Sequence, residues 1–195
     1  GFNNRKVSYR MGNNVLESVT EERDRGVIIH QSLKSSSQCI KAVKSANATL
    51  GMIKRTFITR NKTTLLQLYR ALVRPKLEYC VQAWRPFLQR DIDLLEKVQR
   101  RATRLMVDNK TLSYEERLKS LHLTTLETRR LRGDLIETFK ILRKLEGTES
   151  SLYFEMSGTG LRGHSLKLYK EQARLDARKY FLVKEWLTRG MHFLK

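Results

Sequence analysis

The feature that most constrains the fold is a helical spacing of apolar residues from about residue 36 to about residue 145. Apolar side chains that recur every three or four positions share one face of an α-helix. The first such stripe consists of Ile40, Val43, Ala46, Leu50 and Ile53. It follows serines 35–37, which can cap a helix, and it ends at the basic pair Lys54-Arg55. We therefore predict a mainly α-helical fold.

Capping residues and prolines predict the ends of the later helices. Asn61 is suited to cap the second helix. Pro75 and Pro86 mark the ends of the second and third helices, because the residue before proline avoids the helical region. Residues 113–116 and 124–127 both match the capping-box pattern. The second box opens a long helix whose predicted core stripe is Leu131, Leu135, Phe139, Leu142 and Leu145.

The chain divides into three predicted regions. Residues 1–34 read as short β strands, with a turn signal at Gly12-Asn13-Asn14 and a β-branched run at 26–30. Such strands are marginal alone in water, so they either form a small helix-covered sheet or, as we favour, complete a sheet outside this chain. Residues 35–110 are predicted to form a helical bundle. Residues 111–195 are predicted to form a smaller C-terminal helical region, with a last helix near 176–186.

The net charge of +19, from 39 basic and 20 acidic residues, indicates a polyanionic partner. Nucleic acid is the first choice and an anionic membrane surface the second. No apolar run is long enough to span a bilayer. Residues 35–110 carry 16 basic and 5 acidic residues, so the polyanion surface is predicted in the helical bundle.

The stretch 95–106 is the most specific part of this charge pattern. In a helix, Leu95, Val98, Ala102, Leu105 and Met106 fall on one stripe. Lys97, Arg100, Arg101 and Arg104 fall opposite, on an arc in which we expect no acid. Charged helix faces are usually only solvated, but basic and acidic groups then intersperse. We therefore favour nucleic-acid contact for these four residues.

Further basic residues are weaker candidates for the same surface. Lys54, Arg55 and Arg60 lie at or after the end of the first predicted helix. Arg129 and Arg130 lie near Glu127 and Asp134, so pairing within their helix is about equally plausible for them.

The chain lacks the residues that several kinds of catalytic site require. Two-metal phosphoryl transfer needs clustered carboxylates, yet no Asp-Asp dipeptide occurs, and Asp91 and Asp93 are better explained as residues of a helix start. The four histidines have no metal-ligand spacing. We predict a chain that is not an enzyme on its own and has no cofactor. Cys39 and Cys80, both expected to be buried, form no Cys-x-x-Cys pair and indicate a reducing compartment. We expect an intracellular location, in the nucleus and cytoplasm.

Short motifs follow one another along nearly the whole chain: Gly26-Val-Ile-Ile29, Leu50-Gly-Met-Ile-Lys-Arg-Thr-Phe57, Leu68-Tyr-Arg-Ala-Leu-Val-Arg-Pro-Lys-Leu-Glu-Tyr-Cys80, Trp84, Asp91-Ile-Asp-Leu-Leu-Glu-Lys-Val-Gln-Arg-Arg-Ala-Thr103, Leu112-Ser-Tyr-Glu-Glu-Arg-Leu118, Arg130-Leu-Arg-Gly-Asp-Leu-Ile136 and Arg162-Gly-His-Ser-Leu166. In this order they resemble the downstream end of the reverse transcriptase of jockey-like non-LTR (LINE-type) retrotransposons. The resemblance implies a fragment that begins after the catalytic Tyr/Phe-Ala-Asp-Asp turn, and the start at Gly1 rather than Met fits that expectation.

The resemblance also implies a role for each region. Residues 7–33 would end the palm, residues 36–106 would form the thumb, and the rest would form a C-terminal helical region of the RNA-directed DNA polymerase. The thumb would grip RNA and RNA–DNA or DNA duplex backbones without reading sequence, and the missing palm and fingers would be its protein partners.

The alternative is a decayed or domesticated helical module that docks on an acidic protein and has no nucleic-acid role. It predicts an uncovered aromatic patch around Tyr79, Trp84 and Phe87. A membrane-surface role ranks third, because the apolar stripes are needed for a core.

Overall fold

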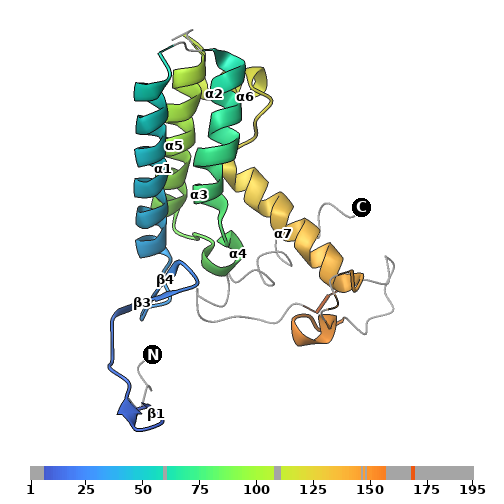
Figure 1. Cartoon of the computed structure of the whole chain (residues 1–195). Helices are drawn as coiled ribbons and strands as arrows, with labels where there is room; N and C mark the ends of the chain where they lie inside the picture. Colours follow the sequence, from blue (N-terminus) through green and yellow to red (C-terminus); the bar gives the residue numbers. More distant parts are fainter. Residues whose placement is uncertain are drawn as a thin grey trace.

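The computed structural model of the chain describes residues 7–58, 61–107, 111–145, 147, 149–156 and 168–169. Within these residues the protein is mainly helical and begins with antiparallel hairpins, as the sequence predicts (Figure 1). The predicted loop at 158–163 and the predicted last helix at 176–186 lie outside the described residues.

Two short hairpins form the N-terminal part. They are β1 (Arg10–Met11) with β2 (Asn14–Val15), and β3 (Glu21–Asp24) with β4 (Val27–His30). Arg25 and Gly26 link β3 to β4 with φ values of 45° and 89°, the left-handed conformation that a tight hairpin turn requires. Residues of β1, β2 and β3 are exposed, and Val27 of β4 is buried in the main core. The side chain of Gln38 accepts a hydrogen bond from the Ile28 N–H at 2.9 Å and fixes this second hairpin to the first helix.

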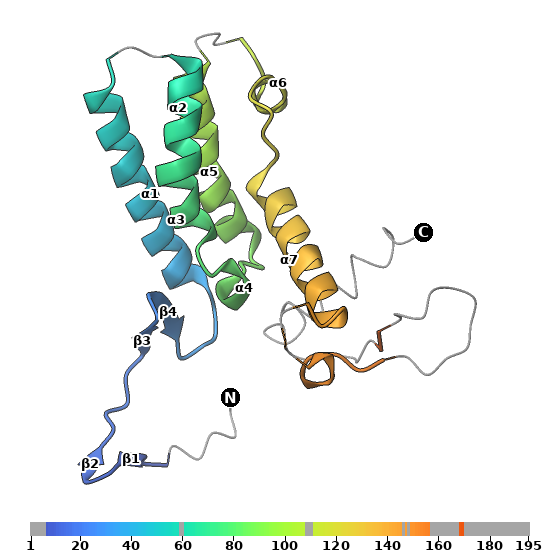
Figure 2. The ribbon, with the colours of Figure 1, turned by 45° about the vertical axis from the view of Figure 1, so that its right-hand side comes forward.

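The helices follow in the order α1 (Ser36–Thr56), α2 (Lys62–Leu68), the π-helical turn η1 (Tyr69–Val73), α3 (Arg74–Glu78), α4 (Val81–Trp84), α5 (Gln89–Met106), α6 (Tyr114–Ser120), α7 (Leu126–Leu142) and the short 3-10 turn η2 (Ser150–Leu152). Both views show α1, α5 and the rod formed by α2, η1 and α3 side by side, with α7 leading away from them (Figures 1 and 2). Helix α1 contacts both α5 and α3, so the three rods enclose one core.

The predicted helix end at Arg74-Pro75 is wrong. Arg74 has helical angles of φ −60° and ψ −40°, and the chain continues from η1 directly into α3. Pro75 lies in the first turn of α3, where its missing N–H is tolerated. The wider π-helical turn before it loosens the regular bonding pattern that a proline ring would otherwise disrupt. The true break comes at Tyr79-Cys80, where Cys80 has φ 52°, and α4 then ends before Pro86 as predicted.

The predicted helix caps are partly confirmed. Asn61 accepts hydrogen bonds from the backbone of Thr63 and Thr64, and Ser113 with Glu116 forms the predicted capping box. The box predicted at 124–127 is wrong, because Thr125 is the cap residue of α7 and accepts from the Thr128 N–H. The serines at the start of α1 do not cap it with their side chains: Ser35, the N-cap residue, makes no such bond, whereas Ser36 donates to Asp91 and Ser37 donates to Glu21.

One main core runs through the bundle and continues into α6 and the start of α7. Its buried members include Ala46, Leu50, Ile53, Tyr69, Val73, Leu77, Trp84, Leu95, Val98, Leu118, Leu121 and Leu126. Tyr114, Leu121 and Leu126 lie beyond residue 110, so the expected boundary between 35–110 and 111–195 does not divide the core. Cys39 is buried as expected, but Cys80 is exposed because it lies in the break between α3 and α4.

Helix α7 is rotated about its axis relative to its predicted orientation. Leu131, Leu135 and Leu142 are only half-buried, and Phe139 and Leu145 are exposed. The buried positions of this helix are Leu126, Arg130, Asp134, Thr138 and Ile141. Polar contacts explain the difference, since Arg85 in the segment after α4 forms an ion pair with Asp134.

Candidate nucleic-acid interface

The predicted division of α5 into a packed stripe and a basic face is confirmed. Leu95, Val98, Ala102 and Met106 are buried in the main core, and Leu105 packs against it. Lys97, Arg100, Arg101 and Arg104 are all exposed. In the part of the chain that the structure describes, none of these four forms an ion pair with a carboxylate. Their charges are therefore not neutralised by acidic neighbours there.

The acidic residues of α5 mostly point inward. Asp91 is 4% exposed and accepts a hydrogen bond from Ser36 Oγ at 2.6 Å. Glu96 is 9% exposed and lies beneath the helix. Asp93 is exposed and accepts from the Gln89 side chain, so the prediction that the arc holds no acid is wrong at its N-terminal end. Asp93 lies one helical turn before Lys97, and from Lys97 onward the exposed face of α5 is basic.

Helix α1 adds further cations beside α5. No acidic residue occurs between Ser36 and Thr56, and Lys44, Lys54 and Arg55 are exposed. Arg101 Nη1 donates a hydrogen bond to Asn47 Oδ1 at 2.8 Å, which places Asn47 at the seam between the two helices. Positions three before and seven after Asn47 project from a similar side of α1, so Lys44 and Lys54 flank this seam. We call Lys44, Lys54, Arg55, Lys97, Arg100, Arg101 and Arg104 the basic surface.

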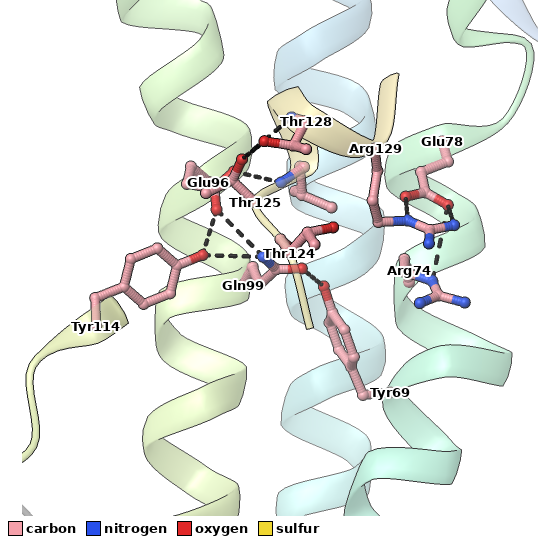
Figure 3. Close-up of polar contacts among 11 residues, drawn as sticks. Tyr69, Arg74, Glu78, Glu96, Gln99, Tyr114, Thr124, Thr125, Thr128 and Arg129 are labelled. Atoms are coloured by element: carbon pink, nitrogen blue, oxygen red, sulfur yellow. Dashed lines mark hydrogen bonds and ion pairs between the residues drawn. The ribbon is translucent and has the colours of Figure 1, made fainter. Parts of the chain in front are cut away.

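A buried polar network contacts the inner side of α5 and holds the helix in place (Figure 3). The carboxylate of Glu96 accepts hydrogen bonds from the Tyr114 hydroxyl and, at 3.0 Å, from the Leu126 N–H at the start of α7. Tyr69 donates to Gln99 Oε1 at 2.6 Å, and Gln99 Nε2 lies 2.9 Å from the Tyr114 oxygen. Burial raises the pKa of Tyr114, and its hydrogen bond to Glu96 raises it further, so the phenol stays protonated as a donor. The network thus fixes α5 against both α6 and α7.

The network also positions one member of the basic surface. The Arg100 guanidinium lies 4.2 Å from the centre of the Tyr114 ring, within the range of a cation–π contact. Arg117 approaches the same ring at 5.7 Å. Arg100 remains exposed although its guanidinium covers the ring. A stacked arginine keeps N–H groups at its edge for an anion, so Tyr114 orients Arg100 and leaves it able to bind.

The other residues predicted to bind nucleic acid do not belong to the basic surface. Arg129 is held by Glu78, with nitrogen–oxygen distances of 2.6 and 3.2 Å, and this hydrogen bonding raises the pKa of Arg129 (Figure 3). Arg130 is 4% exposed, so it cannot contact a duplex at the surface, contrary to the prediction. Both lie on α7, where polar contacts to the bundle take the place of the expected apolar stripe. Arg60 lies outside the described residues.

Lys44 and Arg90 are exposed cations that the sequence reasoning missed. The signal for Lys44 was available, because the whole first helix contains no acid. Arg90 lies 3.8 Å from Asp91, so its charge is partly compensated. The roles of Glu96, Gln99 and Tyr114 had no such signal, because they depend on how α6 and α7 return to α5.

The described residues also bear on protein docking, membrane spanning and metal binding. Trp84 is buried and its indole N–H donates to the Tyr79 carbonyl at 2.8 Å, whereas Phe87 is half-buried and Tyr79 is 58% exposed. Only part of the aromatic patch that the protein-docking alternative predicts is therefore uncovered. Among the described residues, no helix has both the length and the apolar content to cross a membrane. The same residues contain no group of three or more His, Cys, Asp or Glu side chains placed to hold a metal ion.

Comparison of the chain with models of protein families, with curated proteins and with solved structures finds no match. The similarity to retrotransposon reverse transcriptases therefore stays a prediction from the order of short motifs.

Proposed function

We propose that this chain binds nucleic-acid duplexes through their phosphates, and that it is the thumb and C-terminal part of a non-LTR retrotransposon RNA-directed DNA polymerase. The observation that carries the binding proposal is the one-sided charge of α1 and α5. Seven exposed cations lie on two packed helices, while Asp91 and Glu96 are turned inward. Clustered Lys and Arg neutralise phosphates and release counterions, which is the main source of sequence-independent affinity.

The chemistry of the basic surface favours a duplex backbone over unstacked bases. Proteins that grip single strands combine basic grooves with aromatic side chains on which the bases stack. Neither α1 nor α5 contains an aromatic residue, and the nearby Tyr114 is buried under Arg100. Lys97 and Arg104 are two turns apart on α5, or about 10 Å, so they form a row suited to successive phosphates. RNA–DNA, RNA and DNA duplexes all present such rows.

The polymerase part of the proposal rests on the motif resemblance and agrees with the order of the elements. Short exposed hairpins precede the helical bundle, as expected for a palm edge that continues into a thumb. In this proposal the catalytic carboxylates lie upstream, the chain has no polymerase activity or cofactor on its own, and the missing palm and fingers are its partners. The polymerase would act inside the cell, in the cytoplasm and nucleus.

The salt dependence of binding tests the basic surface. We expect replacement of Lys97, Arg100, Arg101 and Arg104 by glutamine to flatten the slope of log affinity against log salt. The change should be about 3 to 4 units, because each neutralised phosphate on B-DNA contributes about 0.9. Fluorescence anisotropy with an RNA–DNA hybrid and a DNA duplex of unrelated sequences measures the slope.

A matched control removes four exposed cations outside the basic surface. Replacement of Lys34, Lys76, Arg132 and Lys144 by glutamine lowers the net charge equally, and we expect it to leave most of the slope intact. Equal slopes in wild-type protein and the α5 variant would contradict the proposal. If a captured partner protein stayed bound after nuclease treatment, the result would favour the protein-docking alternative instead.

A further inference from the structure

Two adjacent arginines of the basic surface are held by uncharged groups from neighbouring helices. Arg100 lies on the Tyr114 ring of α6, with 4.2 Å between the guanidinium and the ring centre. Arg101 Nη1 donates a hydrogen bond to Asn47 Oδ1 of α1 at 2.8 Å. A carboxylate in either place would pair with the arginine and compete with a phosphate. Because both supports are neutral, the two guanidinium groups keep their full charge for a ligand.

The contact with Arg101 is the feature that best explains an asparagine at position 47. Asn47 lies in the middle of α1, where asparagine is a poor helix former because its side chain competes for backbone hydrogen bonds. It is half-buried, and it does not belong to the main core that Ala46 and Leu50 join. Within residues 7–58, 61–107 and 111–145, its side chain makes no hydrogen bond other than the one with Arg101. Asn47 therefore acts on Arg101 and on the seam between α1 and α5.

Holding Arg101 in place lowers the cost of binding a phosphate. A free arginine side chain has many rotamers, and ordering it on binding costs free energy. The bond to Asn47 uses an N–H of Nη1 and leaves most of the guanidinium N–H groups for another acceptor. Arg101 is exposed, so these groups can reach a ligand. The hydrogen bond thus orders Arg101 in advance and leaves it able to bind.

We propose that Asn47 is a positioning residue of the basic surface and orders Arg101 for contact with a duplex phosphate. The inference rests on the proposed nucleic-acid binding and adds an uncharged residue of α1 to it. Asn47 acts through Arg101, so its effect on binding should vanish when Arg101 is removed. The alternative is a structural bond that only ties α1 to α5, which predicts a loss of stability with unchanged duplex affinity.

A double-mutant cycle in the full-length chain tests the positioning role. We expect Asn47→Ala to weaken binding of an RNA–DNA hybrid about two- to tenfold at fixed salt, the cost of ordering one long side chain. In an Arg101→Gln background, Asn47→Ala should change the affinity less than about twofold. Alanine suits the middle of a helix, so the variant should still fold, and urea unfolding checks its stability. Ser45→Ala is the matched control, because Ser45 is exposed on α1 and lies about 200° around the helix from Asn47.

A carboxylate at the same two positions gives a second readout. Asn47→Asp should pair with Arg101 and flatten the slope of log affinity against log salt by about 0.9, as expected for one lost phosphate contact. Ser45→Asp adds the same charge away from the seam and should flatten the slope less. Equal slopes for the two aspartate variants, or an equal effect of Asn47→Ala with and without Arg101, would overturn the positioning role while duplex binding stands. A wild-type chain that binds no duplex would overturn both proposals.

Discussion

At the scale of single residues, Glu96 and Tyr114 link the core to the basic surface. Glu96 lies on the inner side of α5 and accepts a hydrogen bond from the Leu126 N–H. A carboxylate from another helix, instead of a capping box, thus pairs with this backbone N–H at the start of α7. A negative charge at a helix N-terminus is favourable. Tyr114 donates to this carboxylate and carries Arg100 on its ring. The buried Tyr114 ring thus supports one cation of the proposed interface.

Tyr114→Phe separates these two roles. The ring that supports Arg100 remains, but the buried Glu96 loses a donor, so we expect the free energy of unfolding to fall by about 1 to 3 kcal/mol. Urea unfolding measures the loss, while the salt slope of duplex binding should stay near the wild-type value. Tyr79→Phe is the control, since its exposed hydroxyl also makes one hydrogen bond, to the Arg25 carbonyl. A loss no larger for Tyr114 than for Tyr79 would count against the network.

At the scale of elements, the sequence predicts where the helices lie better than it predicts which side of each helix is buried. The stripe of α5 was predictable because its apolar and basic residues separate cleanly at helical spacing. The stripe of α7 was not, because the ion pair of Arg85 with Asp134 depends on a segment about fifty positions earlier. The continuous rod of α2, η1 and α3 was not predicted, because the residue before a proline usually avoids the helical region. Here the packing of Tyr69, Val73 and Leu77 in the core outweighs that preference. The basic surface was predictable on α5, but its continuation on α1 depended on the pairing of the two helices.

The capping box of α6 gives an element-scale prediction about pH. Hydrogen bonds from the Ser113 backbone N–H, and then from its side chain, hold the pKa of Glu116 below its ordinary value. The box therefore contributes stability above the pKa of an unfolded glutamate, and this contribution is lost as the pH falls through the lower folded pKa. A carboxyl NMR titration should place the Glu116 midpoint below that of the unfolded chain. Ser113→Ala should raise the midpoint, and equal folded and unfolded midpoints would contradict the prediction.

At the scale of the whole molecule, the charge is unevenly placed. The exposed acids Glu21, Glu22 and Asp24 of β3 alternate with the exposed Arg23 and Arg25, near the N-terminal end of α1, whereas the exposed cations of the basic surface lie along α1 and α5. A polyanion is therefore attracted more strongly along the side of the bundle than at its hairpin end, where charges of both signs mix. In the proposed thumb, this polarity would help to orient a duplex along the helices.

The continuous main core leads to a prediction about folding units. Tyr114, Leu118, Leu121 and Leu126 complete the core that α1, α3 and α5 begin, and two of the three hydrogen-bond donors to Glu96 lie in the same later segment. A fragment of residues 1–110 would therefore expose apolar surface along α5 and leave Glu96 with only the 3.2 Å hydrogen bond from Gln99 Nε2, both of which are destabilising. We expect this fragment to lack a cooperative thermal transition, in contrast to the full chain, when both are followed by circular dichroism. A transition at the full-chain temperature would instead make residues 35–110 an independent domain, and α6 and α7 would then be dispensable for holding α5 in place.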